Sequence, residues 1–282
     1  GQFIGLADNT GNSFGSHLHL ALKDKAGEAG MPYNLIDPTP GLQWHLDNMH
    51  KRGVHLSADS HNMEGDIEKL KEISADSLVV LSSHNPDQIA ECIKASGADQ
   101  VIVRAFLHFG DRKVSAKDFH KWTVGDVERT VKAVRGAGVT DVWLQIHNEP
   151  NLAQEGMWTA WSDGSEFISW CKEVVRLYSH LNVKTISPPM SPGHSIPGIR
   201  HGESMMYDEM TVNAIRETFD AYGMHAYWGG DGSTPRTAVN RVRAHATTFH
   251  MPTFVTEFSH NGKATVGSGE TLKAKNQVKY SR

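Results

Sequence analysis

Two glutamates in this sequence each follow a short apolar run that is typical of a buried β-strand. Residues 141–151 read Asp-Val-Trp-Leu-Gln-Ile-His-Asn-Glu-Pro-Asn, which places a carboxylate at Glu149. Residues 253–260 read Thr-Phe-Val-Thr-Glu-Phe-Ser-His, which places another at Glu257. Two carboxylates that meet at one mouth of a β/α barrel are the apparatus of glycosidic bond cleavage, one as acid/base and one as nucleophile. This pairing is a far stronger signal than Asn-Glu-Pro alone, which is usually just a loop.

A strand-then-helix rhythm that could position these glutamates repeats from residue 51 onward. The predicted strands cover residues 53–59, 77–83, 100–107, 141–148, 184–190, 221–227 and 253–258. Several of them are nearly continuous apolar runs, as expected for parallel strands buried on both faces. Helical spacing of apolar residues over 126–138 and 165–181 fills two of the intervals. The alternation predicts parallel strands joined by right-handed crossovers, whose carboxyl ends all open on one face.

Seven strands are predicted, one fewer than a closed eight-stranded barrel requires. A Gly-rich loop and one helical pattern at 270–280 follow Glu257. The predicted fold class is therefore α/β, a (β/α)8 TIM-type barrel truncated after strand seven and preceded by a small all-β remnant. The N-terminal part is Gly-rich and lacks the rhythm, so we expect two domains, residues 1–45 and residues 46–282.

The composition limits the classes of function. The chain has 282 residues, of which 39% are hydrophobic and 21% charged, and its net charge is −4. These values are typical of a soluble globular protein, and they argue against a nucleic-acid partner, which calls for a basic patch or stripe. No stretch approaches the ~20 apolar residues of a membrane span. Cys92 and Cys171 fall in predicted amphipathic helices, where we expect buried thiols rather than a disulfide framework.

Residues 51–282 resemble the clan A glycoside hydrolases at three predicted strand ends. The segment 147–150, His-Asn-Glu-Pro, is similar to the acid/base strand of that clan, and 256–258, Thr-Glu-Phe, to its nucleophile strand. The segment 223–228, Gly-Met-His-Ala-Tyr-Trp, is similar to its His-x-Tyr strand. The resemblance implies a retaining glycosidase whose barrel needs no cofactor. A polysaccharide or cell-wall glycan is expected as substrate from the presence of the N-terminal domain described below.

The same resemblance implies a role for each matching residue. Glu149 would be the general acid/base and Glu257 the nucleophile of a double-displacement reaction. Asn148 would donate a hydrogen bond to the sugar 2-hydroxyl. His225 would line the first subsite, and Tyr227 would hold and orient Glu257.

Three further residues are candidates for substrate binding by their position. Arg104 ends the third predicted strand and could stabilise the charge of the nucleophile, although clan A usually places its arginine one strand earlier. Trp228 ends the sixth predicted strand, and Trp158 lies on the loop after Glu149. Either indole could stack on a sugar, and core packing is the alternative for both.

Histidines near predicted strand ends raise a metal-dependent barrel hydrolase as an alternative. They are His61, His84, His108, His147, His194, His225 and His260. A barrel metal site would usually carry His-x-His on its first strand, where this sequence offers only His55. A polar, sugar-binding barrel face is therefore favoured over a metal site.

The N-terminal segment has a motif of its own. Residues 9–20 carry a Gly-Asn-Ser turn, a glycine and then His17-Leu-His19, and with 33–40 they resemble the end of a lysostaphin-like (LytM-type) zinc metallopeptidase. Alternation along a strand places both histidines on one face. The resemblance implies that His19 binds zinc and that His17 is a neighbouring acid/base. Catalytic zinc needs three protein ligands, and this segment supplies one or two, so we expect zinc only in a complete peptidase domain.

Two alternatives to a glycosidase remain open. The chain could be a fragment of a cell-wall zinc metalloendopeptidase whose barrel is a carbohydrate-binding accessory domain. It could also be a non-catalytic carbohydrate-binding barrel, although a decayed site would be expected to lose Asn148, Glu149, Tyr227 or Glu257, and all four are present. The company of the two domains suggests an extracellular or cell-envelope location. The oligomeric state is not predicted.

Overall fold

The computed structural model describes residues 22–23, 35–36, 51–56, 63–110, 112–152, 155, 164–192, 209–228 and 234–260. Contacts divide the chain into two compact units, Gly1–Lys51 and Arg52–Arg282. The first unit contributes one antiparallel pair, strand β1 (Leu22–Lys23) with strand β2 (Leu35–Ile36). The predicted identity of each domain stays a prediction.

The second unit alternates strands with helices. Its strands are β3 (Gly53–His55), β4 (Ser77–Leu81), β5 (Gln100–Ala105), β6 (Asp141–Ile146), β7 (Lys184–Ile186), β8 (Tyr222–Trp228) and β9 (Thr253–His260). Its helices are α2 (Glu64–Glu72), α3 (Pro86–Ser96), α4 (Ala116–Gly136), α5 (Gly164–Tyr178), α6 (Glu209–Thr218) and α7 (Pro235–Phe249), with a 3-10 turn η2 (Ser179–Leu181) after α5. An α-helix lies between each strand and the next, as the sequence predicts.

Two element boundaries differ from the sequence-based expectation for clear physical reasons. Helix α4 begins well before residue 126, because the Ser115 side chain caps it by accepting a hydrogen bond of 3.0 Å from the Asp118 N–H. A side-chain oxygen at this position satisfies a backbone donor that has no partner within the helix. Strand β7 ends at Ile186 and not at residue 190, since the next residues include Pro188 and Pro189, which have no N–H to donate.

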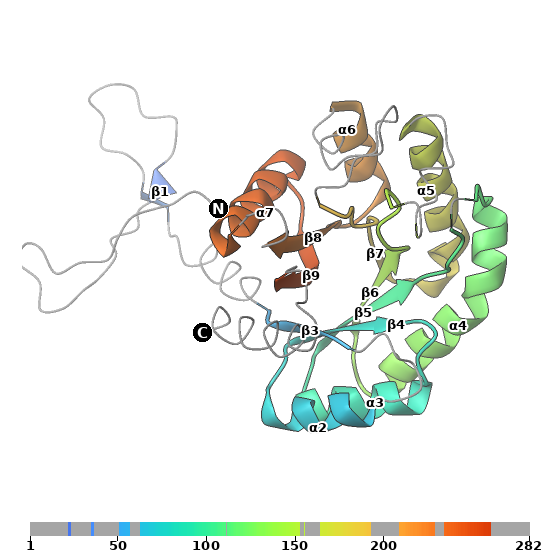
Figure 1. Ribbon diagram of the computed structural model, residues 1–282, viewed down its shortest axis with the longest axis vertical. Helices are drawn as coiled ribbons and strands as arrows, with labels where there is room; N and C mark the ends of the chain where they lie inside the picture. The colour runs from blue at the N-terminus through green and yellow to red at the C-terminus, as the bar shows by residue number, and fades with distance from the viewer. Residues whose placement is uncertain are drawn as a thin grey trace, which may run out of the picture. The chain divides into compact units, whose positions relative to one another are not determined.

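The strands pair in parallel and in chain order. Strands β3 to β7 form a five-stranded sheet, and β8 pairs with β9. An isolated parallel bridge between Ile186 and Ala221 continues the order from β7 to β8. The helices flank these strands on the outside (Figure 1). This is an α/β fold with parallel strands, and within the described residues no ladder joins β9 to β3, so closure of a barrel is not shown.

The strands curl around one layer of interior side chains. This layer consists of Val79, Ile102, Trp143, Ile186 and Ala221, with Phe254 packed against it. One member comes from each of β4, β5, β6 and β7, Ala221 immediately precedes β8, and Phe254 lies in β9. The ring centroids of Trp143 and Phe254 lie 4.7 Å apart, although β7 and β8 separate their strands in the pairing order. Such contact requires strong curvature, which is the arrangement that fills the inside of a β/α barrel.

A larger core lies between the strands and the helices. It takes the alternate side chains of the strands, such as Val103 and Leu144, and packs them against helical residues such as Phe119 and Val174. Burial of this apolar surface provides the main driving force for folding. The two cysteines are buried and free within helices of this layer, as predicted. Among the described helices, none combines the length and the hydropathy needed to cross a membrane.

Gly223 allows β8 to approach the end of β7 closely. A Cβ atom at this position would lie 2.4 Å from the Ser187 carbonyl oxygen and 2.9 Å from Cγ2 of Ile186. The Gly223 N–H donates a hydrogen bond of 3.0 Å to Ser187 Oγ. A side chain therefore cannot be added here without moving a strand, and the strand that would move carries His225.

We predict that Gly223→Ala lowers the free energy of unfolding by about 1–3 kcal/mol, the usual cost of overpacking a core. Denaturant unfolding measures this change. Gly65→Ala is the matched control, because open space surrounds Gly65 in α2, where alanine is the better helix former. Equal stability of the wild type and Gly223→Ala would show that β8 can shift without cost.

Candidate active site

A β-bulge in β9 sets the direction of Glu257. The register steps from Met224 opposite Val255 to His225 opposite Glu257, which leaves Thr256 as an extra residue on β9. In an unbroken ladder Thr256 would oppose His225. Because directly opposed residues share a face of the sheet, the bulge turns the Glu257 carboxylate toward the imidazole.

The Glu257 carboxylate is surrounded by hydrogen-bond donors. Arg104 Nη1 donates to Oε1 at 2.7 Å, and the Tyr227 hydroxyl donates to Oε2. His225 Nε2 lies 3.5 Å from Oε1. Burial, the largest single influence, raises the pKa of Glu257, whereas the neighbouring His225 and Arg104 lower it electrostatically. With the two donated hydrogen bonds, the pKa falls to about 2, so this carboxylate is held ionised.

Glu149 sits in a turn with an unusual backbone. His147 has φ 57° and Glu149 has φ 33°, values that residues with side chains rarely adopt. The turn is held by the His147 N–H, which donates to the Ala105 carbonyl at 2.8 Å, and by the Leu152 N–H, which donates to the Glu149 carbonyl at 2.9 Å. Such strain persists only where surrounding contacts fix it, and it is common at functional sites.

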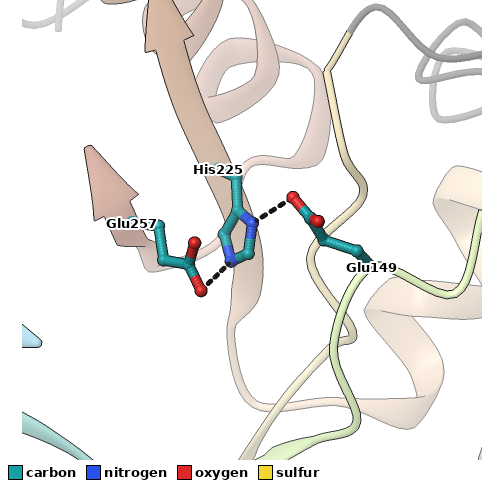
Figure 2. A group of neighbouring side chains, drawn as sticks. All are labelled: Glu149, His225 and Glu257. Carbon is teal, nitrogen blue, oxygen red and sulfur yellow. Dashed lines mark hydrogen bonds and ion pairs between the residues drawn. The ribbon is translucent and has the colours of Figure 1, made fainter. Parts of the chain in front are cut away.

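His225 joins the two glutamates. Figure 2 shows its ring between their carboxylates, with Nδ1 2.7 Å from Glu149 Oε1 and Nε2 facing Glu257. The imidazole and Glu149 are both buried. One oxygen of each carboxylate and one ring nitrogen all lie within 4.8 Å of one another. Two carboxylates therefore meet here, Glu149 after the end of β6 and Glu257 within the second half of β9. Glu257 is the one that contacts Arg104.

These three side chains could also hold a metal ion, since each offers one ligand atom within that distance. The Arg104 guanidinium opposes this use, because it already occupies the Glu257 oxygen at 2.7 Å and would repel a cation. The arrangement therefore favours chemistry by the carboxylates themselves.

The structure brings most of the predicted site residues together. They are Arg104, Asn148, Glu149, His225, Tyr227 and Glu257. Trp228 is different, because it is only 3% exposed and packs against Phe258 and Ala238 on the helix side of β8. A sugar contact for Trp228 stays a prediction, and Trp158, His17 and His19 lie outside the described residues.

Three residues near the site were not assigned a role by sequence reasoning. His55 Nε2, at the end of β3, lies 3.8 Å from Glu257 Oε1; burial, then the charge of Arg104, lowers the pKa of this histidine to about 4. The buried Asn151 side chain bonds both the N–H and the carbonyl of Ser191, at 2.8 and 2.9 Å, and so anchors the turn that carries Glu149. Glu155 accepts a hydrogen bond from the Asn148 amide. The place of His55 on the first predicted strand was the one available signal, and the observed strand β3 ends at this residue.

Comparison with solved structures finds glycoside hydrolases of families GH128, GH39, GH17 and GH26. A GH128 (subgroup II) endo-β-1,3-glucanase from Sorangium cellulosum is 13% identical over 82% of this chain and 83% of its own, with a TM-score of 0.50. A GH26 β-mannanase from Bacteroides ovatus is 9% identical over 78% and 75%, with a TM-score of 0.49. The 3-keto-D-glucoside 4-epimerase YcjR from E. coli is 12% identical over 81% and 97%, with a TM-score of 0.44.

No family model and no curated protein matches the chain. At such low identity the likeness to the glucanase shows the fold alone: an α/β arrangement similar to glycoside hydrolase barrels. The comparisons give no support to the resemblance between the N-terminal segment and a lysostaphin-like peptidase.

We predict that Tyr227→Phe raises the pKa of Glu257, because the variant lacks one of the hydrogen bonds that stabilise the carboxylate. Carbon-13 NMR of the glutamate carboxyls measures this pKa. Since the folded-state pKa lies below the ordinary value of 4.5, the contribution of Glu257 to stability is present above that value and is lost as the pH falls toward 2.

The cost of Tyr227→Phe should therefore be largest near neutral pH, at ~1.5–3 kcal/mol for a hydrogen bond to a charged group, and should shrink in acid. Tyr222→Phe is the control, because the Tyr222 hydroxyl lies 3.0 Å from His245 Nδ1 rather than beside Glu257. A Glu257 pKa that is the same in all three proteins would contradict this account of its environment.

Proposed function

We propose that this chain is a retaining glycoside hydrolase that cleaves O-glycosidic bonds of a polysaccharide or cell-wall glycan. The observation that carries the proposal is the pair of carboxylates, Glu149 and Glu257, with one oxygen of each within 4.8 Å of the other. Carboxyl groups ~5–5.5 Å apart serve retention, whereas ~6.5–9.5 Å leaves room for the water of an inverting enzyme. The short separation favours the retaining reaction.

The surroundings of the two groups favour one assignment of roles. Arg104, His225 and Tyr227 hold Glu257 as a carboxylate, which suits a nucleophile. In the described part of the chain, Glu149 is paired with neither a lysine nor an arginine; its ion-pair partner is His225. A buried carboxyl with fewer cationic neighbours suits the group that must carry a proton to the leaving oxygen.

The reaction would proceed in two steps. Glu257 attacks the anomeric carbon and forms a glycosyl ester, while Glu149 gives its proton to the departing sugar oxygen. Glu149, now ionised, takes a proton from water as that water attacks the anomeric carbon, and the Glu257 carboxylate leaves. Arg104 and Tyr227 stabilise Glu257 in its charged form before the first step and after the second.

The sugar is the open part of the proposal. The Sorangium cellulosum neighbour is an endo-β-1,3-glucanase, which makes β-1,3-glucan the first polymer to test within a panel of β-glycans. A zinc peptidase with an accessory barrel has no specific observation in its favour.

We predict that Glu257→Gln abolishes turnover of every substrate, because the amide cannot form the ester. Glu149→Gln should lower kcat/KM by ~10²–10⁴-fold on substrates with poor leaving groups and much less on aryl glycosides whose leaving groups need no proton. Kinetics on matched aryl glycosides and glucan oligosaccharides measure both effects. Glu68→Gln, the same change at an exposed position on α2, should behave as the wild type. Equal losses on both substrate kinds for Glu149→Gln would contradict its role as the acid.

A further inference from the structure

Glu155 is held beside the site by its main chain and its side chain. The ring Nε2 of His147 lies 2.6 Å from the Glu155 carbonyl oxygen, and the Asn148 amide nitrogen donates to the Glu155 carboxylate. The Glu155 N–H donates to the Leu152 carbonyl at 3.1 Å. His147 and Asn148, the two residues before Glu149, thus both contact Glu155, which lies six positions after Glu149.

The contact with the Glu155 carboxylate determines which way the Asn148 amide faces. An ionised carboxylate only accepts hydrogen bonds, so Glu155 selects the NH₂ end of the amide. The other end, Oδ1, is buried and has no hydrogen-bond partner among the described residues. A buried acceptor without a donor is costly, and a ligand hydroxyl would satisfy it. Asn148 therefore offers an acceptor to a ligand, whereas its resemblance to the clan A asparagine implies a donor.

We propose that Glu155 is a positioning residue, which as a carboxylate turns the Asn148 amide so that Oδ1 receives a hydroxyl of the bound sugar. When Glu155 is protonated, its O–H can instead donate to Oδ1, and the reversed amide then presents NH₂. The ionisation of Glu155 thus sets whether the site offers an acceptor or a donor next to Glu149. The identity of the ligand as a sugar rests on the proposed function, whereas the orientation of the amide does not.

The charged groups around Glu155 make this switch accessible. Burial raises the pKa of Glu155, and the hydrogen bond from Asn148 lowers it. Negative charge on Glu257, and on Glu149 whenever it is ionised, raises it further, and the charge of Arg104 lowers it. The net direction is upward, so the switch occurs at a higher pH than for an ordinary glutamate.

His147 faces Glu155 as a neutral donor. Burial, the largest influence, lowers the pKa of His147 to about 4. Its contact is with the Glu155 main chain, so it holds the position of the loop without competing for the carboxylate.

The test follows the Asn148 side-chain amide by ¹H–¹⁵N NMR in the full chain without substrate. Its resonances are assigned by their loss in Asn148→Asp. In the wild type we expect them to shift with pH through a single transition, above the ordinary glutamate pKa. In Glu155→Gln the pH-dependent shift should vanish. Glu68→Gln, which changes an exposed glutamate on α2, should retain the shift. Amide resonances that do not respond to pH in the wild type, or that respond equally in Glu155→Gln, would overturn the proposal.

The pH dependence of KM is a second test, because a residue with a merely structural role would not change it. With any β-glycan that the wild type hydrolyses, KM should change roughly three- to tenfold as the pH falls through the NMR transition, about the contribution of one hydrogen bond. The reason is that the sugar hydroxyl that donates to Oδ1 above the transition must turn to accept from NH₂ below it. KM of Glu155→Gln should be independent of pH over the same range. A KM that varies identically in both proteins would contradict the link to substrate. Absence of hydrolysis would count against the proposed function alone, because the NMR titration needs no substrate.

Discussion

The negative charge on Glu257 is the constraint on which the rest of the site depends. A partly buried carboxylate is unfavourable unless cations and donors meet it. Here Arg104 comes from β5, and His225 and Tyr227 come from β8. These strands can reach one carboxylate on β9 only because the sheet curls around its interior layer of side chains. The charged state of Glu257 therefore depends on the curvature of the fold.

The second carboxylate is positioned by different means. Glu149 lies in a turn whose backbone is strained and is therefore tied down on several sides, including the clamp between Asn151 and Ser191. His225 contacts both glutamates, so a shift of β8 would disturb both at once. Glu149 and Glu257 are chemically identical carboxyl groups in different surroundings. Such a difference is what allows one carboxyl to serve as acid and the other as nucleophile.

Sequence reasoning located the strands because parallel strands buried on both faces are continuous apolar runs, and it found Glu149 and Glu257 because they follow such runs. Two features could not be read in this way. The bulge at Thr256 breaks the two-residue alternation, and only pairing with β8 reveals it. Glu155 lies on a loop, where no periodicity applies, and only the structure shows its contact with Asn148. For Trp228 the sequence left sugar stacking and core packing open, and the structure shows the side chain to be buried.

The central claim is that Glu257 is the nucleophile of a double displacement. The most direct measurement uses a dinitrophenyl glycoside, with fluorine at carbon 2, of a sugar that the wild-type chain hydrolyses. The fluorine slows breakdown of the glycosyl–enzyme ester, so peptide mass spectrometry can locate it. We predict one added sugar per chain, attached to Glu257. A sugar attached to another residue, or turnover with inverted anomeric configuration and no adduct, would contradict the account.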